Sequence, residues 1–298
     1  MSATTNNPAP SSVPARRRPG AGQIAGELLL TVGALLLLFV FYEAFWTNLA
    51  ANRLQNEAAA GLEEMWDAAP AAAQNSEPIP SAVPPLGEPF ARIHMPAIGP
   101  DATYAVVEGT RNEDLRTGPV HYPETQMPGE RGNAALAGHR NGSGAVFEHL
   151  DRLHSCDAVV VETETQWMTY RLLPLETGPT ERLAAARECL TEEQLDRVAT
   201  GDYAHIQGRH ITTPDAVEVI AQLPGSPLAP GGAAEASGHR GFDDDEFAIA
   251  DATADLERML TLTTCHPLFS NAERMIVHAI LVETIAKADG QLPTALEE

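Results

Sequence analysis

A cysteine, a histidine and an arginine, far apart in the sequence, together have the functional groups of an acyl-transfer site. Cys265 ends the run LTLTTC, His139 lies where an apolar run enters the Gly-rich segment HRNGSG, and Arg274 begins the apolar run after the Cys265 loop. A thiolate can attack a carbonyl carbon, an imidazole can give and take a proton near neutral pH, and a guanidinium can hold an oxyanion. The three residues would therefore support covalent chemistry through a thioester, whereas a lone cysteine in an apolar strand is otherwise a small core residue.

Short apolar runs separated by Gly and Pro must position these residues. If the strands that hold Cys265 and Arg274 pair through the loop 266–273, both residues lie at the same end of a sheet. The Gly-rich segment after His139 would place that ring at a barrel rim. Seven runs predict a β-barrel or sandwich: Thr103–Val107, Asn133–Ala137, Ala158–Thr163, Trp167–Leu173, Ala216–Gln222, Met259–Thr264 and Arg274–Glu283.

Two segments interrupt this strand pattern. Residues 180–200 have a helical composition, with Thr191 and Gln194 placed as a capping box. Residues 224–246 are turn-forming and charged and predict a mobile loop. The region 90–298 has about the size of one β-rich domain with insertions.

An apolar segment near the N-terminus predicts a transmembrane anchor over residues 24–46. Residues 28–42 carry no charge, and aromatic residues follow them as in an interfacial belt. A cleaved signal peptide, with a site near Ala50, is the alternative. The basic cluster at residues 16–18 precedes the apolar run, so the positive-inside rule places the N-terminus in the cytoplasm and the following chain outside.

The segments on either side of the anchor have simple compositions. Residues 1–23 contain little to bury and predict a disordered cytoplasmic N-terminus. Residues 47–68 have a helix-forming composition and residues 69–89 are rich in proline, so residues 47–89 predict a stalk or linker.

The composition excludes some classes of partner and site. The chain has 19 basic and 41 acidic residues and a formal charge of -22, which argues against nucleic acid binding. Three cysteines are too few for a disulfide scaffold. The pairs Cys265 with His266 and His205 with His210 lack a third ligand at a recognisable spacing, so no metal site and no cofactor are expected.

The order and spacing of these motifs resemble the sortases, the membrane-anchored cysteine transpeptidases of Gram-positive surfaces. The likeness rests on AGHR around His139, on TLTTC ending at Cys265, and on Arg274 ahead of a strand. Supporting matches are the segments 115–133 and 146–153. The HYP and CHP motifs and the N-terminal anchor are most similar to the housekeeping-type group called class E.

This resemblance implies a fold and a reaction. The fold would be an all-β, eight-stranded antiparallel barrel with a helical insertion. Cys265 would attack the Thr-Gly carbonyl of an LAxTG-like C-terminal sorting signal on a surface protein, His139 would transfer protons, and Arg274 would hold the oxyanion. The acyl group would pass to a cell-wall peptide amine. The resemblance also implies that Thr264, Tyr122 and His266 contact the substrate.

Two departures from the family pattern leave alternatives open. Cys156 stands where a glycine is common, and Cys189 lies in the helical insertion, so the two could form a disulfide or remain separate thiols. The acidic run at residues 243–246 could bind Ca²⁺ or be a solvated charged stretch. The function also has alternatives, namely a pilin-polymerising sortase or an idle barrel that binds sorting signals or wall peptides.

Overall fold

The computed structural model describes residues 20–42, 47–68, 83–226 and 255–298. The chain divides into two units, Met1–Ala44 and Phe45–Glu298. In the first unit, helix α1 (Ala21–Phe41) is long and apolar enough to cross a membrane. Its 21 residues rise about 30 Å, which matches the hydrocarbon thickness of a bilayer. This helix fits a single-pass membrane anchor.

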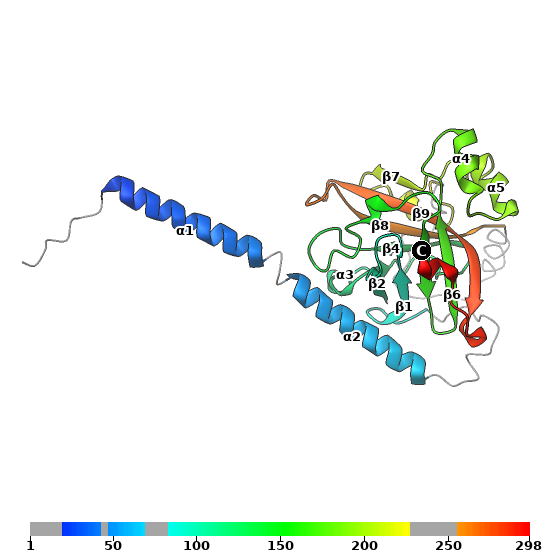
Figure 1. The fold of residues 1–298 in the computed structure, drawn as a ribbon, viewed down its shortest axis with the longest axis horizontal. Helices are drawn as coiled ribbons and strands as arrows, with labels where there is room; N and C mark the ends of the chain where they lie inside the picture. Colours follow the sequence, from blue (N-terminus) through cyan, green and yellow to red (C-terminus); the bar gives the residue numbers. More distant parts are fainter. Residues whose placement is uncertain (1–19, 43–46, 69–82, 227–254) are drawn as a thin grey trace, which may run out of the picture. The chain divides into compact units, whose positions relative to one another are not determined.

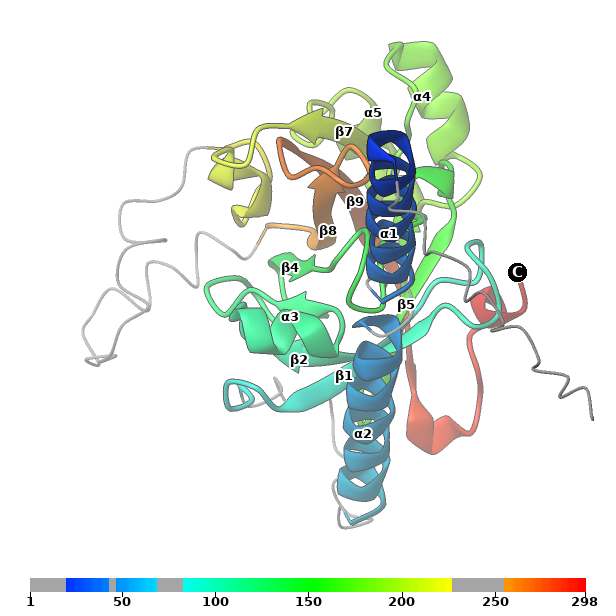
Figure 2. The same cartoon turned by 90° about the vertical axis from the view of Figure 1, so that its left-hand side faces the viewer.

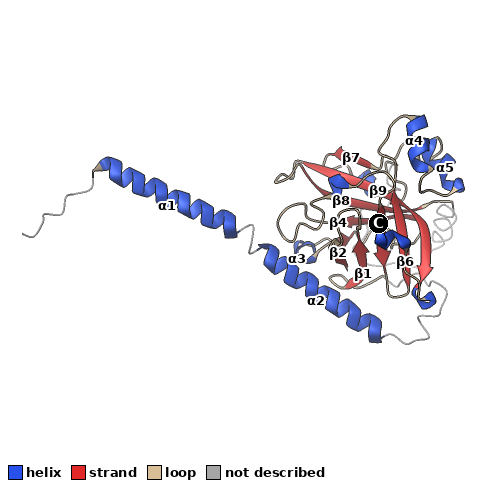
Figure 3. Cartoon of the chain, in the orientation of Figure 1, coloured by secondary structure: helices blue, strands red, loops and turns tan. Residues whose placement is uncertain are grey.

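A closed β-barrel forms the centre of the second unit (Figures 1 and 3). Its strands are ordered β6-β5-β1-β2-β3-β4-β8-β9, and β6 pairs with β9 to close these eight strands, while β7 adds to β9 outside the ring. The predicted eight-stranded barrel is therefore confirmed. The bounds are β1 (Pro89–His94), β2 (Thr103–Glu108), β3 (Val120–His121), β4 (Gly132–Ala137), β5 (Ala158–Glu162), β6 (Gln166–Leu172), β7 (Arg209–Thr212), β8 (Arg258–His266) and β9 (Glu273–Ala286).

Two details of the predicted sheet are wrong. The sheet is mixed rather than purely antiparallel, because β2 runs parallel to β3 and β4 runs parallel to β8. The predicted strand Ala216–Gln222 instead contains the 3-10 turn η3 (Val217–Ile220). This run contacts β4 through a side chain, since Asn133 Nδ2 donates to the carbonyl of Ala221 at 3.1 Å. It makes no ladder with any strand in the part of the chain that the structure describes.

The barrel interior is filled by alternate side chains of its strands, which form one large apolar cluster that includes Ile93, Leu136, Leu262 and Val277. Alternation places these residues on the inner face of each strand. Since every strand of the ring is paired on both sides, the barrel is a rigid platform for residues at its rim.

The helical insertion forms a second, smaller core on the outside of the barrel. Helices α4 (Pro179–Ala186) and α5 (Glu192–Ala199) pack with Met259 and Ile280 of the last two strands. Thr191 caps α5 in the predicted capping box with Gln194. In Figures 1 and 3 both helices lie outside the ring of strands.

A disulfide ties this insertion to the barrel. Cys156 and Cys189 are bonded, with their Cα atoms 5.6 Å apart. Cys156 has a φ of 71°, a left-handed conformation that favours glycine. The backbone conformation of Cys156 is therefore less favourable than it would be for glycine, and the stabilisation by the disulfide offsets this free-energy cost.

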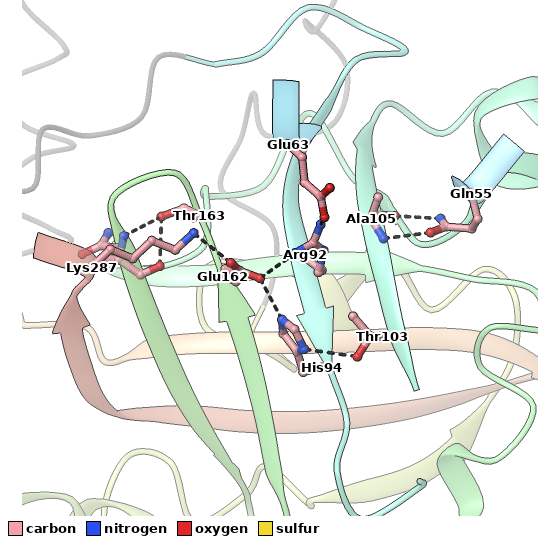
Figure 4. Close-up of polar contacts among 10 residues, drawn as sticks. Gln55, Glu63, Arg92, His94, Thr103, Ala105, Glu162, Thr163 and Lys287 are labelled. Carbon is pink, nitrogen blue, oxygen red and sulfur yellow. Dashed lines mark hydrogen bonds and ion pairs between the residues drawn. The ribbon is translucent and has the colours of Figure 1, made fainter. Parts of the chain in front are cut away.

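Helix α2 (Thr47–Ala68) packs against the barrel beside α3 (Asn112–Thr117), as Figures 1 and 2 show. Leu62 is fully buried. The side-chain amide of Gln55 accepts from the backbone N–H of Ala105 at 2.8 Å and donates to its carbonyl at 2.9 Å (Figure 4). Strand β3 pairs with β2 only from Val107 onwards, so Gln55 replaces a neighbouring strand at this edge.

A charged cluster joins α2, β1, β5 and Lys287, the first residue after β9 (Figure 4). The nearly buried carboxylate of Glu162 contacts Arg92 at 3.2 Å, His94 at 3.0 Å and Lys287 at 2.8 Å, and Arg92 also pairs with Glu63 of α2 at 2.8 Å. Burial raises the pKa of Glu162, but the hydrogen bonds from His94 and Lys287 and the nearby cationic charges outweigh it and lower that pKa. The carboxylate therefore stays ionised and holds these elements together.

Candidate active site

Pairing of β8 with β9 brings Cys265 next to Arg274. The two residues are direct cross-strand partners in the antiparallel ladder, one residue before the end of β8 and one after the start of β9. Opposed residues in such a ladder place their side chains on the same face, with Cβ atoms about 5 Å apart. The thiol and the guanidinium therefore share one face at one end of the barrel.

His139 comes to the same end because the chain beyond β4 continues beside β8. Ala137 is the partner of Thr263, and the next N–H, that of Gly138, donates to the carbonyl of Thr263 at 3.1 Å. The hydroxyl of Thr264 donates to the carbonyl of Gly138 at 2.8 Å. His139 follows directly, so its position along the barrel is level with Cys265.

The pKa of His139, whose ring is half-buried, is lower than that of an ordinary histidine. Burial lowers the pKa of His139, and the positive charge of Arg116 on α3 lowers it further. Within the described ranges, neither ring nitrogen has a hydrogen-bond partner. The ring is therefore neutral over more of the pH range than an ordinary histidine and is free to exchange a proton with a bound group.

Arg274 is held in place by the loop that precedes it. Its Nη1 donates to the carbonyls of Asn271 at 3.0 Å and Glu273 at 2.9 Å. No other atom of this guanidinium has a hydrogen-bond partner in the part of the chain that the structure describes. The remaining N–H groups could therefore donate to a carbonyl oxygen near Cys265, which is partly exposed and not in a disulfide.

Tyr122 lies beside Cys265 and Arg274, and Thr264 lies beneath them. The hydroxyl of Tyr122 is 3.2 Å from that of Thr263, burial raises the pKa of Tyr122, and the charges of Arg274 and Cys265 act on it. Thr264 is buried, and its hydroxyl is already used by Gly138. Tyr122 can thus face a bound ligand, whereas Thr264 holds the backbone that carries His139.

His266 is partly exposed and lies within a row of charged residues. Its Nδ1 is 2.6 Å from Nη1 of the buried Arg140, and its Nε2 is 4.0 Å from the carboxylate of Glu273. The sequence did not single out Arg140 or Arg116. The only signal for Arg140 is its position next to His139, and Arg116 gives none, because the fold of α3 brings it to the site.

The acidic run at residues 243–246, which the sequence offers as a Ca²⁺ site or a solvated charged stretch, lies outside the described residues. Among the residues that the structure does describe, no three or more His, Cys, Asp or Glu side chains are grouped so that they could hold a metal ion.

A model of the sortase domain matches residues 93–282, which include His139, Cys265 and Arg274. The chain belongs to the sortase family. Among solved structures, this chain is similar to the SrtF sortase from Corynebacterium diphtheriae, with 45% identity and a TM-score of 0.63 over 75% of this chain and 99% of that one. The likeness extends over almost all of the solved chain, which agrees with the barrel described above.

Two curated relatives are class E sortases of Streptomyces coelicolor. Sortase SrtE1 is 30% identical over 291 residues, covering 94% of this chain and 63% of the relative. Sortase SrtE2 is 33% identical over 168 residues, covering 52% of this chain and 65% of the relative. The matches thus span less than two thirds of either relative's length. The resemblance to class E sortases is confirmed.

Proposed function

We propose that this sortase is a membrane-anchored cysteine transpeptidase that cleaves an LAxTG-like sorting signal between Thr and Gly. The observation that carries the proposal is the meeting of Cys265, His139 and Arg274 at one end of the barrel. Residues 90–298 would be the catalytic domain outside the cell, residues 24–46 its anchor, residues 47–89 the link between them, and residues 1–23 a cytoplasmic tail.

The first half of the reaction would form a thioester. The thiolate of Cys265 attacks the carbonyl carbon of the Thr-Gly bond, and the oxyanion that develops accepts hydrogen bonds from Arg274. His139, as imidazolium, gives its proton to the departing amine of glycine. Tyr122, Thr264 and His266 border the thiol in sequence or space; of these, Tyr122 would touch the bound signal, whereas Thr264 and His266 would support the catalytic residues from behind.

The second half would transfer the acyl group to a cell-wall amine. Neutral His139 takes a proton from the incoming amine, which attacks the thioester and releases the thiolate. The active form needs both a thiolate and an imidazolium. Because the pKa of His139 is lowered, a smaller fraction of this ring would carry the imidazolium proton near neutral pH than in an ordinary histidine.

The test is the detection of the acyl-enzyme on the full chain in detergent. The protein is incubated with a labelled LAxTG peptide, and intact mass is measured with and without hydroxylamine, which cleaves thioesters. The expected result is a hydroxylamine-sensitive adduct of the peptide's N-terminal fragment on the wild type and none on Cys265→Ala. An adduct on a folded Cys265→Ala variant, or a wild type that binds the peptide without an adduct, would refute the proposal.

A further inference from the structure

A second row of side chains runs beside the three proposed catalytic residues. Arg140 follows His139, His266 follows Cys265, and Glu273 precedes Arg274, so each member of the second row is the chain neighbour of a member of the first. His266 and Glu273 are cross-strand partners, like Cys265 and Arg274. Because successive strand residues point to opposite faces, His266 and Glu273 lie behind Cys265 and Arg274. Arg140 belongs to this row through its contact with His266.

One hydrogen bond and two longer ion-pair contacts run along this row. Arg140 Nη1 lies 2.6 Å from His266 Nδ1, and His266 Nε2 lies 4.0 Å from Glu273 Oε2. At the other end, Arg140 Nη2 lies 3.7 Å from Asp151 Oδ2. The side chain of Asp151 is 49% exposed, so the short bond to His266 is the main interaction of Arg140.

The chemistry of the two groups fixes the state of His266. A guanidinium can only donate hydrogen bonds, so Nδ1 of His266 must accept and cannot carry a proton. The proton of the neutral ring therefore lies on Nε2 and faces the carboxylate of Glu273. Arg140 thus selects one tautomer and one ring orientation.

The burial of Arg140 argues that this bond has a specific role. Its side chain is 4% exposed, and its Nε has no hydrogen-bond partner among the described residues. A buried cation with an unpaired donor is costly, and an apolar side chain would fill the same space at lower cost. The contact with His266 is what the guanidinium adds.

We propose that Arg140 is a positioning residue of this enzyme, an inference that rests on the proposed function. By fixing His266, it joins the segment that carries His139 to the strand end that carries Cys265. A second tie between the same segments supports this, since Asn141 Oδ1 accepts from the backbone N–H of Phe269 at 3.1 Å. The ties together set the relative position of thiol and imidazole.

The first experiment compares substitutions of Arg140 in the full chain in detergent. Arg140→Met should lower kcat by about 10- to 100-fold, the scale of a small misplacement of reacting groups, with KM changed less than about threefold. Arg140→Lys, which can still donate to Nδ1, should recover part of the loss. Arg187→Met, at an exposed arginine on the insertion, is the matched control and should behave as wild type.

Substitutions of His266 test whether Arg140 acts through that ring. His266→Asn keeps an acceptor close to the position of Nδ1 and should retain most of the kcat, whereas His266→Leu should lose as much as Arg140→Met. The double variant Arg140→Met/His266→Leu should be no slower than either single variant, because both remove the same contact. Unfolding temperatures of all variants separate loss of fold from loss of position.

A readout that needs no substrate separates this inference from the proposed function. NMR of protein labelled with ¹⁵N-histidine should show the Nε2–H tautomer of His266 in the wild type and a mixture of tautomers in Arg140→Met. An unchanged tautomer, or a kcat within about twofold of wild type in a folded Arg140→Met variant, would overturn the inference. A wild type that shows the fixed tautomer but never forms an acyl-enzyme would instead refute only the proposed function.

Discussion

Replacing Gln55 with leucine should detach α2 from the barrel at one defined point. The substitution leaves the backbone N–H and carbonyl of Ala105 without a partner, and Ala105 is 1% exposed. An unpaired buried polar group costs about 1 to 3 kcal/mol. The two groups together, with some relief from entering water, lead us to expect a loss of about 2 to 4 kcal/mol. For a domain of this size, that corresponds to a fall in Tm of roughly 5 to 15 °C.

Two measurements on the full chain check this expectation. Thermal unfolding gives the change in Tm, and hydrogen exchange at the amide of Ala105 reports the lost bond directly, because that N–H should exchange much faster in Gln55→Leu. Gln207→Leu, at an exposed glutamine, is the matched control and should change neither quantity. A Gln55→Leu protein with wild-type Tm and a protected Ala105 amide would refute the reasoning, since another group would then have to satisfy this edge.

Three further predictions concern the site and the insertion. Arg274→Ala should lower kcat by on the order of 100-fold, with partial recovery in Arg274→Lys, and a loss below about threefold in steady-state assays would assign Arg274 a purely structural role. Arg116→Gln removes a cation that disfavours the imidazolium, so the pKa of His139 should rise. The limb of the pH profile of kcat/KM that His139 sets should move to higher pH, by less than about one unit because Arg116 is exposed, and an unchanged profile would contradict this. Cys189→Ser removes the disulfide that closes a loop of 33 residues, and the free energy of unfolding measured by chemical denaturation should fall by about 3 to 4 kcal/mol. Adding Cys156→Gly should restore about 1 kcal/mol of this stability, because glycine favours the left-handed conformation at that position, whereas adding Cys156→Ser should not.

The sequence predicted those parts of the site that depend on neighbouring chain segments. Cys265 and Arg274 lie on consecutive strands joined by a short loop, so their pairing follows from the hairpin alone. The position of His139 depends on β4 lying parallel to β8, a contact between neighbouring strands that are far apart in the sequence. No local pattern encodes such a contact, and for this residue the prediction relied on the family motif.

The errors and omissions also have physical causes. Ala216–Gln222 is rich in β-branched residues, but only a strand with a partner forms a ladder, and this run pairs with none of the described strands. Strand β3 contains two residues, Val120 and His121, which is too short for any alternation to show. Arg116 and Arg140 were missed because their roles depend on which side chains they reach in three dimensions.

The packing of α2 separates two ways of drawing the limits of this protein. The family domain begins at residue 93, yet β1 begins at Pro89 and the edge of β2 is completed by Gln55. A soluble fragment cut at the family boundary would expose the backbone of Ala105 as an open sheet edge and remove Glu63 from the charged cluster. Open edges invite pairing between molecules. A fragment that begins before Thr47 would keep both contacts. The segment needed for a stable fold is therefore longer than the segment that matches the family model.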